Sequence, residues 1–320
     1  MRVLIVKTSS MGDVVHALPA ISDMAEAMPG IEIDWLVERG FAAMPEQHHA
    51  VRRVIALQWR KWRRNLRAPE TREALKAWRA EMRRDPYDLI IDMQGLLKSA
   101  AFACMARGPR AGYDWHSIRE PLASLFYSRR AHVSRDLHAV DRCRQLASKL
   151  LGYPLPNTPP DFGLRASSQA WTPGTQPFAT LIPCASRPEK LWPQSSWTAL
   201  GQALRQRGWQ VAVMWGIPEE HKLAQGIAQA IDGVVPPFLS VAQAADTLAQ
   251  SQVVIGLDTG MSHLAAAHGR PTIGIYCDHE PGLAGLMGSG PVASLGGKGQ
   301  IPSLPDVQHA LRHLLDHLPA

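Results

Sequence analysis

Short apolar segments alternate with amphipathic helical patterns along most of this 320-residue chain. The segment Leu89-Ile90-Ile91 is continuously apolar, as is typical of a parallel strand that is covered on both faces. Alternation of this kind predicts an α/β protein with doubly wound parallel sheets. We expect strands at 2–7, 31–37, 51–57, 88–92, 178–182, 209–215, 253–257 and 272–276. We expect helices at 13–28, 70–84, 96–107, 137–151, 196–207, 219–231, 241–250, from about 260, and at 307–318, with a loop at 282–299.

The stretch 152–160 holds four prolines in nine residues, which is typical of a linker between domains. It predicts a first domain at 1–152, a linker at 153–174 and a second domain at 175–320. Apolar runs are too short for a signal peptide or for the roughly 18 residues of a membrane-spanning helix, so we expect a cytoplasmic protein. The four cysteines are far apart and lack metal-ligand spacing, which predicts reduced thiols in or near the core.

The net charge of +6 comes from one region of the chain. Residues 51–84 contain twelve Lys or Arg and three Glu, a local charge of +9 that leaves −3 for the rest. This basic stretch indicates a polyanionic partner or an anionic membrane face. Nucleic acid is one possible polyanion, but a single cluster without a recognisable DNA- or RNA-binding motif supports it weakly.

A carboxylate follows the first predicted strand at Asp13, after the turn Thr8-Ser9-Ser10-Met11-Gly12. In a doubly wound sheet, ligands bind where strands end and helices begin. Asp13 could therefore act on a ligand, or it could only stabilise the dipole of its helix. Pro19 should bend that helix because it removes a hydrogen bond to the carbonyl of Val15.

A second turn of this kind follows the strand at 253–257, where Asp258, Thr259 and Gly260 open a helix that carries His263. The free N–H groups at a helix start favour a phosphate, with Thr259 and His263 as further donors. The alternative is a structural helix start with Asp258 as its N-cap. The loop at 182–193 contributes Lys190, which could neutralise a diphosphate. Glu220 could accept hydrogen bonds from ribose hydroxyls or only favour its helix dipole.

Other nucleotide-binding motifs are absent. The sequence has no G-x-x-x-x-G-K-[ST], no G-x-G-x-x-G after a strand and no D-x-D. This disfavours P-loop NTPases, dehydrogenases of the usual type and metal-dependent glycosyltransferases.

Five segments, 6–20, 59–64, 92–100, 114–127 and 258–267, together resemble the lipopolysaccharide heptosyltransferases of glycosyltransferase family 9. The resemblance is strongest to the branch that adds the first heptose to Kdo-lipid A. It implies a GT-B fold and an inverting, metal-independent transfer from ADP-L-glycero-D-manno-heptose to a Kdo hydroxyl, without a cofactor. It also implies peripheral contact with the cytoplasmic face of the inner membrane, and no nucleic-acid partner.

The resemblance implies roles for individual residues. Asp13 matches the catalytic base, and Lys190 stabilises the leaving ADP. Donor-binding positions are Ser186, Lys190, Glu220, Leu239, Asp258, Thr259, Gly260 and His263. Acceptor-binding positions are Ser10, Arg60, Lys61, Arg63, Arg64, Gln94, Lys98, Arg119 and His138. The chain departs from the family at Ala185-Ser186, where two hydroxyl residues are common, and at Leu239, where methionine is common.

Three alternatives remain open: a heptosyltransferase that adds a later heptose, a GT-B-type nucleotide-sugar epimerase, and a noncatalytic nucleic-acid-binding protein. The segment 114–127 argues against the first of these. Within that segment, Leu122, Leu125, Phe126 and Tyr127 could touch lipid, but we expect most of them to pack inside the protein.

Overall fold

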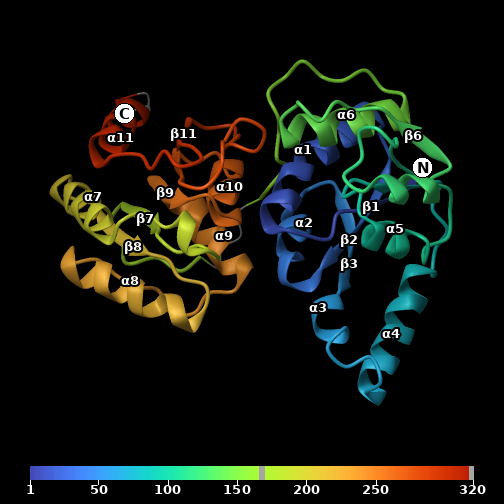
Figure 1. Ribbon diagram of the computed structural model, residues 1–320, viewed down its shortest axis with the longest axis horizontal. Coiled ribbons are helices and arrows are strands. Elements are labelled where there is room, and N and C mark those ends of the chain that lie inside the picture. The colour runs from blue at the N-terminus through green and yellow to red at the C-terminus, as the bar shows by residue number, and fades with distance from the viewer. Residues whose placement is uncertain (166–169, 317–320) are drawn as a thin grey trace. The chain divides into compact units, whose positions relative to one another are not determined.

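A computed structural model describes residues 1–165 and 170–316 and divides the chain into two units, Met1–Gly163 and Leu164–Ala320 (Figure 1). The first unit comprises β1 (Arg2–Val6), α1 (Met11–Ala27), β2 (Glu32–Glu38), η1 (Arg39–Phe41), α2 (Ala43–Gln47), β3 (Val51–Leu57), α3 (Trp59–Trp62), α4 (Pro69–Met82), β4 (Leu89–Asp92), α5 (Leu97–Ala103), β5 (Arg110–Tyr113), η2 (Pro121–Phe126), β6 (Arg129–Ala131) and α6 (Ala139–Leu151). The second comprises β7 (Phe178–Ile182), η3 (Pro188–Lys190), α7 (Gln194–Gln206), β8 (Gln210–Val213), α8 (Pro218–Ala230), α9 (Val241–Gln250), β9 (Val253–Leu257), α10 (Gly260–Ala267), β10 (Thr272–Tyr276), β11 (Val292–Gly296) and α11 (Leu304–Asp316).

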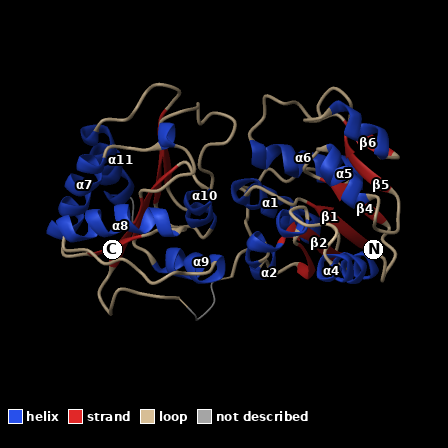
Figure 2. Cartoon of the chain, turned by 60° about the horizontal axis from the view of Figure 1, so that its bottom comes forward, coloured by secondary structure: helices blue, strands red, loops and turns tan. Residues whose placement is uncertain are grey.

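Each unit is built on one parallel sheet with helices on both faces (Figure 2). The first sheet has the strand order β3-β2-β1-β4-β5-β6, and the second has the order β11-β10-β9-β7-β8. All neighbouring strands in both sheets are parallel. The predicted doubly wound α/β organisation is therefore confirmed.

Each sheet reverses its direction of winding at one point, between β1 and β4 in the first unit and between β7 and β9 in the second. The loops that follow two such strands diverge to opposite faces, which leaves a crevice at the carboxyl edge of the sheet. Asp13 follows β1, and Asp258 follows β9. Both turns selected from the sequence thus lie at the position where open α/β sheets bind ligands.

Alternate residues of the first strand enter different parts of the core because side chains of a strand alternate between the two faces. Leu4 and Val6 join a buried cluster with Trp78 of α4 and Phe102 of α5. On α1 and α6, which pack together, a buried ion pair joins Arg144 Nε to Asp23 Oδ2 at 2.7 Å. The second unit has its own large core on β7–β10 and the helices α7, α8 and α11.

Several local predictions were wrong. The expected loop at 282–299 contains β11, which pairs with β10 at the edge of the second sheet. Thr259, not Asp258, is the N-cap of α10. All four cysteines are free thiols, but Cys104 is exposed, unlike the three others. We expected most of the four apolar side chains of segment 114–127 to pack inside the protein. Leu122, Leu125 and Phe126 are exposed, and only Tyr127 is buried.

No helix within residues 1–165 and 170–316 is long and apolar enough to cross a membrane.

His268, at the carboxyl end of α10, should make the stability of the protein depend on pH. Burial lowers its pKa to about 4, with Arg270 acting in the same direction and Asp246 opposing it. Nε2 of His268 has no hydrogen-bond partner among the described residues. The unfolded chain binds a proton here below about pH 6.5, whereas the folded chain does so only near pH 4. The contribution of neutral His268 to the free energy of unfolding is therefore fully present above pH 6.5. It is lost as the pH falls, by about 2 kcal/mol at pH 5.

Urea unfolding at pH 7 and pH 5 tests this expectation. We expect His268→Asn to reduce the acid-side loss of stability by about 2 kcal/mol. His309→Asn, which removes an exposed histidine of the same unit, serves as the matched control. An equal pH dependence in the wild type and in His268→Asn would contradict the prediction.

Candidate active site

The first candidate turn, in the first unit, lies between β1 and α1. Ser10 is the N-cap of α1, and Asp13 is the third residue of the helix. The backbone N and the hydroxyl Oγ of Ser10 both donate to Asp13 Oδ2, at 2.7 and 2.8 Å. Serine followed three residues later by a carboxylate is a capping box, so the local sequence suffices to place this carboxylate at the helix start.

Electrostatics keep the Asp13 carboxyl ionised. Burial alone would raise its pKa, but the charge of Lys7, the two hydrogen bonds from Ser10 and the charge of Arg119 hold the pKa below its ordinary value. Lys7 is buried, and its Nζ donates to the carbonyl of Met93 at 3.1 Å. Asp13 is therefore a carboxylate at neutral pH and can accept a proton.

Gln94 connects the end of β4 to this turn. Its Oε1 accepts from Thr8 N at 2.7 Å, from Thr8 Oγ1 at 3.0 Å and from Ser9 N at 3.2 Å, and its Nε2 donates to the carbonyl of Ser9. The buried Asp92 in turn accepts from Gln94 N at 2.8 Å. The amide of Gln94 thus braces the turn that carries Asp13, a contact that the sequence alone did not reveal.

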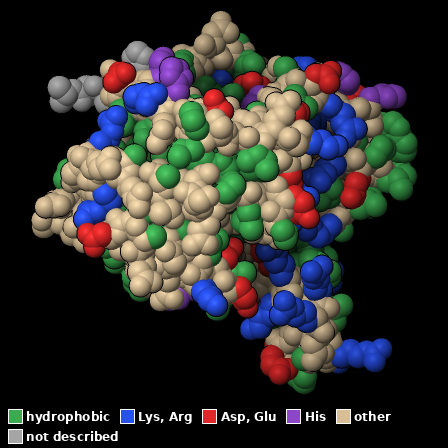
Figure 3. Space-filling view, turned by 60° about the vertical axis from the view of Figure 1, so that its left-hand side comes forward, with side chains coloured by type: hydrophobic (Ala, Val, Ile, Leu, Met, Phe, Trp, Pro, Cys, Tyr) green, Lys and Arg blue, Asp and Glu red, His purple; other side chains and the backbone are tan. Residues whose placement is uncertain are grey.

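The basic residues divide into two groups. Arg52 and Arg53 of β3 form ion pairs with the buried Asp34, each at 2.8 Å, so they neutralise a carboxylate inside the protein. Arg60, Lys61, Arg63 and Arg64 surround α3 and are exposed. Trp62 is buried and packs edge-on against Trp78, with ring centroids 5.9 Å apart, which anchors this short helix. Lys and Arg side chains also cover the projecting end of the first unit around α4 (Figure 3).

The remaining predicted acceptor residues are dispersed. Lys98 and Arg119 are exposed, and the charge of Arg119 reaches Asp13. His138 is the N-cap of α6, where its Nδ1 accepts from Val140 N at 3.2 Å. Its ring meets that of His16 edge-on at 5.7 Å, so this side chain lies beside α1.

The second candidate turn, in the second unit, lies between β9 and α10. Lys190 Nζ forms an ion pair with Asp258 Oδ2 and donates to the carbonyl of Asp258 at 3.3 Å. Nε2 of His263 lies 3.6 Å from Asp258 Oδ1. Burial opposes ionisation of Asp258, but His263 and Lys190 hold the pKa of its carboxyl well below its usual range. The hydroxyl of Thr259 is buried without a hydrogen-bond partner among the described residues, and Gly260 begins the helix beside it.

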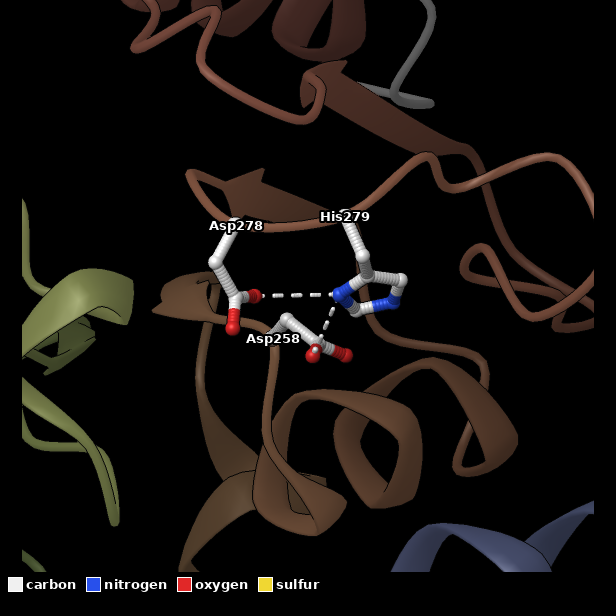
Figure 4. A group of neighbouring side chains, drawn as sticks. All are labelled: Asp258, Asp278 and His279. Carbon is white, nitrogen blue, oxygen red and sulfur yellow. Dashed lines mark hydrogen bonds and ion pairs between the residues drawn. The ribbon is translucent and has the colours of Figure 1, made fainter.

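Asp278 and His279, which follow β10, extend this cluster (Figure 4). Nδ1 of His279 lies 3.2 Å from Asp278 Oδ1 and 3.5 Å from Asp258 Oδ2, and Arg187 pairs with Asp278. Ligand atoms of the two aspartates and His279 lie within 4.8 Å of one another, as a metal site requires. Lys190 and Arg187 already neutralise both carboxylates, so the arrangement is a network of ion pairs. Only the pairing of β9 with β10 brings these distant residues together.

The other predicted donor residues lie around β7 and β8. Oε2 of Glu220 accepts from Gly216 N at 2.8 Å and from Ile217 N at 3.2 Å, so it caps its own helix. Ser186 is exposed in the loop that carries Lys190. Leu239 packs against a small apolar cluster with Met214 and Ile182.

An aromatic group beside these residues was not predicted. The ring centroid of Trp215 lies 4.5 Å from that of His221 and 5.7 Å from that of Phe238. Trp215, just after the carboxyl end of β8, was the feature of the sequence that could have indicated this group.

Comparisons with known proteins bear on the fold and on the family. The pattern of glycosyltransferase family 9 (heptosyltransferase) matches residues 74–307. Lipopolysaccharide heptosyltransferase 1 of Escherichia coli (strain K12) is 43% identical over 90% of this chain and 91% of its own length. The enzyme of that name from Pseudomonas aeruginosa is 42% identical over 90% of this chain and 82% of its own. The structure of E. coli heptosyltransferase WaaC with ADP is similar with a TM-score of 0.91 and 38% identity, over 98% of this chain and 100% of that one.

The same E. coli protein with ADP-2-deoxy-2-fluoro heptose is similar with a TM-score of 0.86, over 99% of both chains. The two parallel sheets therefore form a GT-B-like fold. The extent of the family match and the identity to these relatives show that this chain belongs to glycosyltransferase family 9, the heptosyltransferases, and is a glycosyltransferase.

Proposed function

We propose that this enzyme transfers L-glycero-D-manno-heptose from ADP-heptose to a Kdo residue of Kdo-lipid A, with inversion and without a metal ion. The observation that carries the proposal is the likeness, at 38% identity, to a structure that holds an ADP-heptose analogue. Relatives at 42–43% identity are named lipopolysaccharide heptosyltransferase 1, which supports the first heptose as the one transferred.

The second domain, expected at 175–320 within the second unit, provides the donor site in this proposal. A diphosphate at the start of α10 meets the N–H groups of the helix, the unpartnered hydroxyl of Thr259 and the ammonium of Lys190. These groups stabilise the charge that grows on ADP as the glycosidic bond breaks. Glu220 receives the ribose hydroxyls, Leu239 lies against the adenine, and Ser186, Asp258, Gly260 and His263 complete the site.

The first domain, expected at 1–152 within the first unit, provides the base and the acceptor site. A Kdo hydroxyl attacks the anomeric carbon of the heptose, Asp13 takes the hydroxyl proton, and the electron pair of the breaking bond leaves on ADP. Attack from the face opposite the leaving group inverts the anomeric centre. The base belongs to the first unit and the donor site to the second, and of the expected linker at 153–174 the residues 166–169 lie outside the described residues.

Cations of the first unit bind the anionic acceptor. Arginine pairs with carboxylates and phosphates through two parallel hydrogen bonds, which suits the Kdo carboxylate and the lipid A phosphates. The residues assigned to this surface are Ser10, Arg60, Lys61, Arg63, Arg64, Gln94, Lys98, Arg119 and His138. The enzyme then works at the cytoplasmic face of the inner membrane, and nucleic acid is no partner.

Release of ADP from ADP-heptose, measured with and without Kdo-lipid A and in the presence of EDTA, tests the proposal. We expect release that depends on the acceptor, continues with EDTA, and yields the heptosylated lipid by mass spectrometry. Release or isomerisation of the sugar nucleotide without acceptor would favour an epimerase. Activity only on an acceptor that already carries one heptose would favour a later-acting heptosyltransferase.

A further inference from the structure

Helix η2 carries its large apolar side chains on the outside. Leu122, Leu125 and Phe126 are 54%, 62% and 44% exposed. We name these three residues the apolar ridge. Residues i and i+3 of a 3₁₀ helix lie on the same side, so Leu122 and Leu125 stand in line, with Phe126 beside them. Ala123 and Ser124 fill the inner positions and are buried.

The framework around η2 keeps the ridge outside. Tyr127, which follows it, is buried, and its hydroxyl donates to Asp92 Oδ2 at 2.7 Å. A Cβ at Gly112 would lie 2.5 Å from the Tyr127 ring, so the ring packs directly against the backbone of Gly112 under the ridge. Ser124 Oγ donates to the carbonyl of Pro121 at 2.8 Å. The inner positions are therefore occupied, and the ridge cannot turn inward without displacing buried groups.

Cations surround the base of the apolar ridge. Arg110 Nε donates to the carbonyl of Phe126 at 3.0 Å, and Arg130 Nε donates to that of Ser124 at 2.8 Å. Arg110 and Arg130 thus lie on the face of the sheet that carries η2, whereas Arg129, next to Arg130 on β6, points to the other face. The carboxylate of Glu120, before η2, accepts from Leu97 N at 2.6 Å. The surface thus combines exposed apolar side chains with an excess of positive charge.

We propose that the apolar ridge inserts into the interfacial region of an anionic lipid bilayer while Arg110 and Arg130 contact lipid phosphates. Apolar side chains next to Lys or Arg are the combination that holds proteins at membrane surfaces. A bilayer accepts such side chains without a complementary pocket, which a protein partner would have to supply. The inference rests on the proposed membrane contact and assigns it to a segment outside the basic stretch at 51–84.

Co-sedimentation of the full chain with vesicles tests the ridge. The vesicles contain phosphatidylethanolamine and phosphatidylglycerol, without donor or acceptor. We expect the triple variant Leu122→Ser, Leu125→Ser, Phe126→Ser to lower the partition coefficient at least about tenfold. Ile301→Ser, which changes a side chain of the second unit that is 56% exposed, should leave it unchanged. Arg110→Gln should weaken binding less, and phosphatidylcholine vesicles should bind the wild type more weakly.

A second variant tests the proposal even if the triple variant misfolds. Leu125→Trp keeps an apolar side chain on η2 and should strengthen vesicle binding several-fold, because tryptophan favours the membrane interface. Equal binding by the wild type and both variants would overturn the proposal. So would a wild-type dimer in sedimentation velocity that the triple variant dissociates, since the ridge would then bind a second copy of the chain.

The experiment separates failure of the ridge from failure of the proposed reaction. If the ridge is right, the triple variant loses vesicle binding but retains ADP release with a deacylated, water-soluble Kdo acceptor. If the proposed reaction is wrong, every variant lacks acceptor-dependent release while vesicle binding still depends on the ridge. If the wild type does not bind anionic vesicles, the ridge proposal falls and the reaction can still stand.

Discussion

Replacing Asp13 by Asn is expected to lower kcat by about 10²- to 10⁴-fold, the usual contribution of a general base. This corresponds to about 3 to 5 kcal/mol in the barrier. An amide cannot take the proton of the attacking hydroxyl, although it can still accept a hydrogen bond from Ser10. The affinity for ADP should change little, because the cradle for the diphosphate lies in the second unit. Single-turnover rates and calorimetric titration with ADP measure the two effects.

Asp306→Asn is a matched control for this change. Ser303 N and Oγ donate to Asp306 at 3.1 and 2.5 Å, as Ser10 does to Asp13, but this capping pair begins α11. The control variant should keep the wild-type kcat. The wild-type rate should also fall only below the usual pKa range of aspartate, because Asp13 has a lowered pKa and stays ionised down to that pH. Normal turnover by Asp13→Asn would exclude Asp13 as the base.

The second large effect is expected from Lys190→Met. Removing one preorganised group that stabilises developing charge typically costs about 10²- to 10³-fold in kcat. The change also removes a cation from the ground state, so the affinity for ADP should weaken as well. This joint effect on rate and affinity distinguishes Lys190 from Asp13. Steady-state kinetics with varied ADP-heptose and titration with ADP measure it.

Arg205→Met controls for loss of an ion pair in the same unit. Arg205 of α7 forms an ion pair with Asp232, which follows α8, at 2.7 Å. We expect a near-normal rate and ADP affinity in this variant. A Lys190→Met enzyme with unchanged ADP affinity would show that the lysine does not reach the diphosphate.

Hydrophobic periodicity predicted most of the fold because it is a local property of strands and helices. It failed for β5 and β6, which have four and three residues, and for the edge strand β11, which is only partly buried along its length. Such short or edge strands owe their conformation to pairing with a neighbour, which their own sequence does not encode. Helix α1, which packs against α6, continues through Pro19.

The sequence by itself determined where the two ligand-binding turns lie. A strand followed by a capped helix is a local pattern, so the order of residues suffices to locate Asp13 and the Asp258–Gly260 turn. Tertiary structure decided what surrounds them, because pairing of separate strands brings Gln94 beside Thr8 and His279 beside Asp258. It also decided that the apolar ridge faces outward, since the small side chains of η2 and the ring of Tyr127 occupy the space inside.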